Sequence, residues 1–263
     1  MSKSNSKTSN LRIIEASNPR IIEYSLNHQS IIMTLTLLCL VGPSGSGKTT
    51  LANAMETYGD VPTICSYTTR PMRPNETQGV EHRFIPNDAA AKILTEHRPL
   101  AYTKFGGYHY FALWDQLHIG MPEYELMTYV IDEVGLLGLM SEVDEYRDRI
   151  RFDYRLPLPA DIHVLPIYID RPEEQRLADT DADRLKRDDD RIDIDPSLFK
   201  IRIQNDAKDT ASLIAWSKDF ADAIRAYLTC KSANAMPAAA HCIYTSQPGV
   251  ANIIAAINDA LHK

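Results

Sequence analysis

The chain has 263 residues, 44% of them hydrophobic and 24% charged, and its formal net charge is −7. This length and composition are typical of a folded protein that can bury a full core, as one large domain or as one domain with inserts. The acidic balance and the lack of a basic face argue against general affinity for nucleic acids, so we expect no nucleic-acid partner.

Nothing in the chain predicts a membrane span or a disulfide framework. The longest apolar run, residues 31–41, is shorter than the ~20 residues that a spanning helix needs. The four cysteines show no C-x-x-C pairing, which is typical of reduced residues in a cytoplasmic protein. We therefore expect a cytoplasmic protein with no membrane partner, and no sequence feature indicates its oligomeric state.

Residues 1–30 open with a segment rich in Ser, Lys and Asn, which we predict to be disordered. Met33 stands close to the start of the first apolar strand, so a functional chain could begin there. We expect the extension to be dispensable and the folded domain to span residues 31–263.

Residues 41–50, VGPSGSGKTT, match the phosphate-binding pattern G-x-x-x-x-G-K-[ST]. Glycines let the backbone curl so that its N–H groups converge on phosphate oxygens, and the following helix offers its positive end. Lys48 would reach the β- and γ-phosphates of a nucleotide, and the Thr49 hydroxyl would hold Mg²⁺. The predicted nucleotide-binding residues are Gly42, Pro43, Ser44, Gly45, Ser46, Gly47, Lys48, Thr49 and Thr50.

The sequence on both sides of this loop is what a phosphate loop needs. Residues 31–40 predict a buried parallel strand. After the loop, apolar residues recur at helical spacing up to a glycine that would end the helix, namely Leu51, Ala52, Met55, Tyr58 and Gly59.

A second motif occupies residues 66–84, after a predicted strand at 61–67. Its sequence, SYTTRPMRPNETQGVEHRF, carries Arg70 and Arg73 among hydroxyl residues and prolines that favour an extended backbone. Two guanidinium forks at this spacing can converge on one small anion such as a phosphate monoester. The alternative is a solvated loop of arginine and glutamate.

Together the two motifs resemble those of guanylate kinases. The pattern S-x-T-T-R-x-x-R-x-x-E-x-x-G-x-E behind a phosphate loop is similar to the family's, and the resemblance runs in order from about Leu35 to Asp206. It implies an α/β, P-loop NTPase-type three-layer fold with a central parallel sheet, an inserted small lobe for a nucleoside monophosphate at 66–112, and a helical lid at 172–195. It also implies ATP- and Mg²⁺-dependent phosphoryl transfer to GMP or dGMP, in purine nucleotide metabolism.

The resemblance further implies roles for individual residues. Those around the acceptor nucleotide would be Ser66, Arg70, Arg73, Glu76, His82, Tyr110 and Asp132. Those that act on the transferred group would be Lys48, Arg184, Arg187, Arg191 and Arg202. His82 departs from the family's usual Tyr, and we expect its titration to give the acceptor site a pH dependence near neutrality.

The positions that read the base depart further from the family. A carboxylate is the natural acceptor for the N1–H and 2-amino groups of guanine, but the family's Glu aligns with Ala101 and its later Ser with Ala112. Discrimination between bases that depends on such hydrogen-bonded pairs is lost when the protein partner is missing. The alternatives to a strict guanylate kinase are a (deoxy)nucleotide or sugar-phosphate kinase of altered specificity and a non-catalytic guanylate kinase-like interaction module.

The segments between the phosphate loop and the lid are predicted in chain order. They are a helix at 87–98, an aromatic segment at 100–110, a strand at 125–131, a helix at 134–143 interrupted at Gly135 and Gly138, a surface connection at 144–155, and a strand at 162–169. Within the last strand, Pro166 suggests an edge position or a bulge, because proline cannot donate to a sheet ladder.

The C-terminal third of the chain carries the predicted lid and four further predicted segments. Pro172, with two glutamates after it, predicts the start of a helix. Asp195 and Pro196 predict another helix, which would carry Arg202. The last predicted elements are an insert with an extra helix at 210–236, a strand at 241–245 and an amphipathic helix at 249–262.

Overall fold

A computed structural model describes residues 33–117, 125–152, 160–179, 199 and 201–232. Several expectations concern residues outside these ranges, namely those for 1–30, for most of the lid with Arg184, Arg187 and Arg191, for Asp195 and Pro196, for 233–236, for 241–245 and for 249–262.

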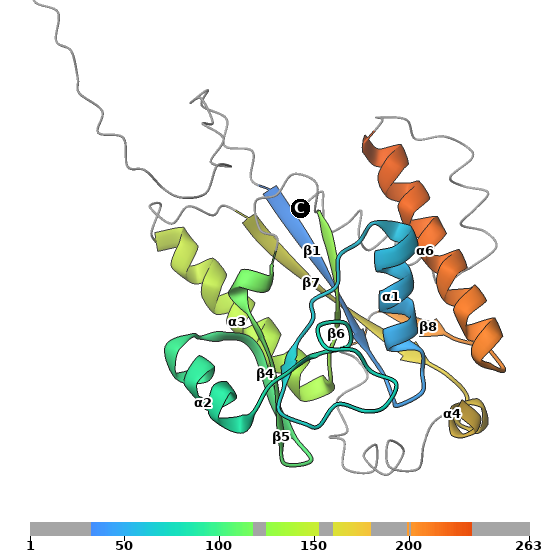
Figure 1. The fold of residues 1–263 in the computed structure, drawn as a ribbon. Helices are drawn as coiled ribbons and strands as arrows, with labels where there is room; N and C mark the ends of the chain where they lie inside the picture. Colours follow the sequence, from blue (N-terminus) through green and yellow to red (C-terminus); the bar gives the residue numbers. More distant parts are fainter. Residues whose placement is uncertain (1–32, 118–124, 153–159, 180–198, 200, 233–263) are drawn as a thin grey trace, which may run out of the picture. The chain divides into compact units, whose positions relative to one another are not determined.

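The larger of the two described sheets is parallel and has four strands (Figure 1). Its strands are β1 (Met33–Val41), β6 (Leu126–Val130), β7 (Ala160–Asp170) and β8 (Ile201–Gln204), in the order β6-β1-β7-β8. All neighbouring strands run parallel. β1 lies between two neighbours, so the phosphate loop at its carboxyl end lies at the middle of the edge where such sheets bind ligands. The prediction of an α/β fold with a central parallel sheet is confirmed.

β1 is apolar except for Thr34 and Thr36, because its alternate side chains enter two different cores. On one face Leu38 and Leu40 pack in a core that includes Leu51 and Phe220. On the other face Leu37 and Cys39 belong to a second core.

Helices cover both faces of this sheet, which gives three layers (Figure 1). α1 (Lys48–Gly59) and α6 (Thr210–Ser232) pack against each other on one face, and α3 (Glu133–Phe152) covers the other. A shorter helix, α4 (Glu173–Asp179), comes after β7. Buried residues of α6 belong to the same core as the sheet, so this helix is an integral part of the layer. Among the helices of the described ranges, none is both long and apolar enough to cross a membrane.

A smaller mixed sheet occupies the stretch predicted for the acceptor lobe. Its strands are β2 (Tyr67–Thr68), β3 (Arg83–Phe84), β4 (Pro99–Phe105) and β5 (Tyr108–Leu113), in the order β3-β2-β5-β4, and the short helix η1 (Trp114–Gln116) comes next in the chain. Gly106 and Gly107 have φ of 56° and 83° and form the two-residue turn between β4 and β5. The bounds of helix α2 (Asn87–Glu96) are close to those predicted, and its Ala90 packs against Phe111.

The helix predicted at 134–143 is longer than expected. α3 runs unbroken from Glu133 to Phe152, so residues 144–152 are helical and neither glycine interrupts the helix. A single glycine costs a helix only about 1 kcal/mol, which packing can offset. At Gly135 the small residue is needed, because a Cβ there would lie 2.9 Å from Cγ1 of Ile131.

The prediction of a helix that carries Arg202 is wrong for the residues that the structure describes. Residues 201–204 are strand β8, in which Ile201 and Ile203 are buried and Arg202 is exposed. This period of two is that of a strand with one buried face.

Two further strand predictions are corrected. Pro166 lies in β7, which is an interior strand of the sheet, and is opposite Cys39 of β1. Among the described residues, the pairing of β7 with β8 starts at Ile167, next to the proline. The edge position suggested for Pro166 is therefore wrong. The predicted strand at 61–67 is instead an irregular segment that makes an isolated parallel bridge to β6 through Thr63 and enters β2 at its last residue.

Candidate functional site

The phosphate loop joins β1 to α1, and its backbone requires its glycines. Gly42, Gly45 and Gly47 have φ of 143°, 75° and 97°, which other residues rarely adopt. A Cβ on Gly42 would lie 2.4 Å from Ile169 O, and one on Gly47 would lie 2.9 Å from Asn205 Nδ2. Both positions therefore exclude a side chain, by backbone conformation and by close contact.

Lys48 is the first residue of α1, and its ammonium group lies against the phosphate loop. Nζ donates to Gly42 O and Pro43 O, each at 2.7 Å, and lies 3.4 Å from Ser46 Oγ. These carbonyls are neutral acceptors, so an anionic phosphate would compete effectively for the same ammonium group.

Thr49 is the next residue in the first turn of α1 and is exposed. Its hydroxyl is a suitable ligand for Mg²⁺, which typically takes few protein ligands and binds nucleotide phosphates as well. Within the described ranges, no group of three or more His, Cys, Asp or Glu side chains could hold a metal ion. Thr49 is thus a residue of the phosphate loop that could contribute an oxygen ligand to Mg²⁺.

The segments after β6, β7 and β8 bring more side chains to the edge that carries the phosphate loop. Asp132 lies after β6, Arg171 after β7, and Asn205 after β8. Asp132 is held by its neighbours, because its Oδ1 accepts from Thr103 Oγ1 at 3.2 Å and from the N–H of Gly135 at 2.8 Å. Its carboxylate is thereby fixed in one orientation.

In the connection between β2 and β3 of the smaller sheet, Arg70, Arg73 and Glu76 form an arginine cluster. Both terminal nitrogens of Arg70 donate to the Glu76 carboxylate at 2.6 Å. Arg73 donates to the same carboxylate through its backbone N–H at 2.9 Å and through Nη1 at 3.2 Å. The two guanidinium groups therefore lie close together on one carboxylate, and their binding of a small anion stays a prediction.

The charges of this cluster shift its pKa values. Burial alone would raise the pKa of Glu76, but hydrogen bonds and charge from Arg70 and Arg73 lower it to about 2. For Arg70, burial lowers the pKa, but the hydrogen bonds and charge of Glu76 and of nearby Tyr110 outweigh it and raise the pKa. Both groups therefore stay charged at neutral pH.

His82 is neutral at physiological pH. Burial and the positive charge of Arg70 lower its pKa to about 4, although Glu76 acts in the opposite direction. The expectation of a titration near neutrality is therefore wrong. Nδ1 of His82 lies 2.9 Å from Ser66 Oγ, and the His82 ring contacts the Tyr110 ring edge to face.

A pocket opens between the smaller sheet and the segment that runs from the end of β6 into α3, and Lys48 reaches it from the first turn of α1. Five residues predicted for the site line it, namely Lys48, Ser66, His82, Tyr110 and Asp132. Arg70 lies next to this pocket, since it interacts with Tyr110 and its charge acts on His82. The two motifs, which are separate in the sequence, thus contribute to one concave surface.

Arg202 is the described one of the four arginines that were predicted to act on the transferred group, and it does not line this pocket. It is exposed on β8, where it pairs with Asp170 at 3.1 Å and lies over the ring of Tyr168. The other three predicted arginines lie outside the described residues. The structure also places side chains at the site that the sequence did not indicate, namely Thr103, Arg171, Arg176 and Asn205. For Arg171 the available signal was its position just after a predicted strand, whereas Asn205 follows a stretch that was predicted to be helical.

The lowered pKa of His82 predicts a pH dependence of stability. The unfolded chain binds the proton near pH 6.5 and the folded chain only near pH 4, so stability is lost as the pH falls between these values. Lowering the pH from 7 to 5 should lower the free energy of unfolding. This loss should be about 1–2 kcal/mol smaller in His82→Gln than in the parent protein. Urea unfolding at the two pH values measures this, with exposed His97→Gln as the control. Equal losses in parent and His82→Gln would contradict the assignment.

A strand-loop-helix phosphate site that shares a pocket with an arginine-bearing lobe defines a P-loop phosphotransferase. Comparison with known proteins shows the family to which the chain belongs. The guanylate kinase family model matches residues 34–117. The chain is 31% identical over 131 residues to the guanylate kinase of Frankia casuarinae, covering 48% of this chain and 67% of that protein. The chain belongs to the guanylate kinase family.

Other relatives match over shorter stretches. The guanylate kinase of Hyphomonas neptunium is 39% identical over 75 residues, which is 28% of this chain and 35% of that protein. Among solved structures, the guanylate kinase of Anaplasma phagocytophilum is 20% identical and covers 81% of this chain and 95% of its own, with a TM-score of 0.51. This likeness supports the fold.

Proposed function

We propose that this protein is an ATP- and Mg²⁺-dependent nucleoside monophosphate kinase that transfers the γ-phosphoryl group to GMP or dGMP. The observation that carries the proposal is the shared pocket. Lys48 of the phosphate loop lines it together with Ser66, His82 and Tyr110 of the smaller sheet. A donor phosphate on the loop and an acceptor phosphate near the arginine cluster would face each other there.

The proposed reaction depends on position and charge more than on covalent chemistry. Lys48 would leave the carbonyls of Gly42 and Pro43 to bind the β- and γ-phosphates. Arg70 and Arg73 would bind the acceptor phosphate, while Glu76 keeps their guanidinium groups together. No general base is needed, because the acceptor is already an anionic phosphate. Mg²⁺, held by Thr49 and the donor phosphates, would neutralise charge on the transferring group.

A panel of nucleoside monophosphates tests the proposal. The protein is incubated with ATP and Mg²⁺ and each common ribo- or deoxynucleotide, and nucleoside diphosphates are separated by chromatography. We expect stoichiometric formation of ADP and of GDP or dGDP. A protein that binds ATP but phosphorylates no monophosphate would instead be a sugar-phosphate kinase or an interaction module.

A second candidate, a kinase with relaxed base specificity, is favoured by one feature of the pocket. Ala101 lines it where a carboxylate could accept from guanine N1–H, and Ala112 is buried beside it in the sheet. Thr103 and Asp132 line the same pocket, and the Thr103 hydroxyl already donates to Asp132. We therefore propose weaker rejection of other bases than a strict guanylate kinase shows.

Ala101→Glu tests this candidate. The new carboxylate would accept from the N1–H and 2-amino groups of guanine and repel the N1 lone pair of adenine. We expect kcat/KM for GMP relative to AMP to rise by about 5- to 150-fold, since each such contact contributes roughly 1–3 kcal/mol. Ala91→Glu, the same change on an exposed face of α2, is the control. An unchanged ratio in a folded Ala101→Glu protein would show that guanine is read elsewhere.

A further inference from the structure

Three consecutive carbonyl groups of the phosphate loop are each held by a side chain from outside the loop. Arg176 Nη1 donates to Ser44 O at 3.2 Å, Arg171 Nη1 donates to Gly45 O at 2.9 Å, and Asn205 Nδ2 donates to Ser46 O at 2.9 Å. We call Arg171, Arg176 and Asn205 the outer brace.

Arg171 is the central member of the outer brace. It is the first residue after β7, and only 2% of it is exposed. Its Nε and Nη2 both donate to Ala207 O, at 3.0 and 2.9 Å, while its Nη1 reaches Gly45 O. The planar guanidinium group thus links the phosphate loop to the segment after β8 in a fixed geometry, which a lysine could not reproduce.

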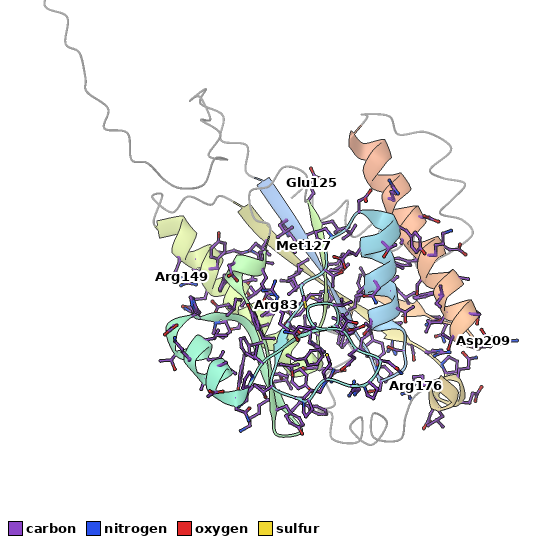
Figure 2. The ribbon with its side chains drawn as sticks, in the orientation of Figure 1. Arg83, Glu125, Met127, Arg149, Arg176 and Asp209 are labelled. Carbon is purple, nitrogen blue, oxygen red and sulfur yellow. The ribbon has the colours of Figure 1, made fainter. Side chains whose placement is uncertain are left out.

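The other two members are held by the same segments. Asn205 is fully buried, and its Oδ1 accepts from the N–H of Ala207 at 3.0 Å, which fixes the amide so that Nδ2 faces Ser46 O. Arg176 of α4 donates through Nε to Arg171 O at 3.2 Å and through Nη1 to the loop. In Figure 2 its side chain lies near the end of α1 that adjoins the loop.

The direction of these carbonyls decides what the loop offers a nucleotide. In a trans peptide the C=O and the following N–H point in opposite directions. Carbonyls of Ser44, Gly45 and Ser46 that point outward therefore turn the N–H groups of Gly45, Ser46 and Gly47 toward the inside of the loop. The N–H of Ser46 donates to Pro43 O of the same loop at 3.3 Å, so the backbone of the loop is curled on itself at this point. Inward N–H groups are the donors that bind phosphate oxygens.

We propose that Arg171, Arg176 and Asn205 are positioning residues for the ATP site, because they hold the phosphate loop in its phosphate-binding conformation before ATP arrives. The inference rests on the proposed function and concerns the donor side of the pocket alone. Loss of one brace contact lets the loop relax, so ATP binding must restore the conformation at a cost in affinity. The brace contacts given above all lie on the donor side, away from the smaller sheet.

The test uses Arg171→Lys, Arg176→Lys and Asn205→Ser, in which no formal charge changes. Calorimetric titration of the full chain with Mg·ATP alone, and then with GMP alone, measures the two sites separately. We expect ATP affinity to fall by about tenfold in each variant and GMP affinity to change by less than about twofold. KM for ATP should rise more than kcat falls. Arg225→Lys is the matched control, because Arg225 donates to a backbone carbonyl, Tyr58 O, at the opposite end of α1.

The outcomes separate this inference from the proposed function. A parent protein that binds no Mg·ATP would overturn both. A parent that binds Mg·ATP, with folded brace variants that bind it equally well, would overturn the inference alone. So would equal losses of ATP and GMP affinity, which would indicate a merely structural role. If Arg171→Lys does not fold, Arg176→Lys decides, because Arg176 is only partly buried.

Discussion

Lys48→Ala should reduce phosphoryl transfer by about 10²–10³-fold or more while the fold stays intact. The ammonium group donates to backbone carbonyls of the phosphate loop and lies near a hydroxyl there, and Lys48 belongs to neither core, so its removal leaves both cores unchanged. In the transition state, however, it would be a positive charge on the group being transferred.

Initial rates with saturating ATP and acceptor measure this effect, and the melting temperature checks the fold. Lys92→Ala is the control, because Lys92 lies on the exposed surface of α2, where it pairs with Glu96 at 4.0 Å. Undiminished turnover by a folded Lys48→Ala protein would refute the assignment of the phosphate loop as the donor site.

Arg70→Lys should raise KM for the acceptor by about 10- to 100-fold and leave ATP affinity nearly unchanged. Arg70 reaches both oxygens of Glu76 at 2.6 Å and also donates to Pro71 O at 2.9 Å. An ammonium group keeps the charge but cannot make two parallel hydrogen bonds to one anion. The cluster would persist as an ion pair with the wrong geometry for phosphate.

Varying ATP and acceptor independently separates the two effects. Arg83→Lys is the matched control, since Arg83 is an exposed arginine of β3, the strand that follows the arginine cluster in the chain, and lies over the ring of Tyr67. A large change in ATP affinity with a normal acceptor KM would contradict the division of the pocket into a donor and an acceptor side.

The sequence predicted the phosphate loop and the arginine cluster because phosphate chemistry restricts residues within a short window. Gly42 and Gly47 must adopt backbone angles that few residues allow, and Arg70 and Arg73 reach one carboxylate from three residues apart. Such local constraints can be recognised without knowing how distant parts of the chain meet.

The outer brace could not be predicted in this way. Arg171 and Gly45 are 126 residues apart, and Asn205 and Ser46 are 159 apart. They meet because β1, β7 and β8 are neighbours in one parallel sheet, so the residues after these strands share an edge. In the sequence, Arg171 before Pro172 resembles any arginine at the start of a helix.

Two elements were mispredicted because a short sequence pattern suggested one structure and packing favoured another. A four-residue strand such as β8 offers only two buried side chains, Ile201 and Ile203, and Arg202 between them suited a helix equally well. In α3 the glycines suggested a break, but burial of Leu136 and Leu139 against the sheet holds the helix together.

The most direct test traces the γ-phosphoryl group itself. The protein is given Mg²⁺, ATP labelled with ³²P at the γ position, and GMP, and the products are separated before the ATP is exhausted. We predict that the label appears at the β-phosphate of GDP, and that Lys48→Ala and Arg70→Lys both suppress this transfer. Label released only as free phosphate, or retained in ATP whichever monophosphate is supplied, would contradict the claim that the phosphate loop and the arginine cluster serve one phosphotransfer site.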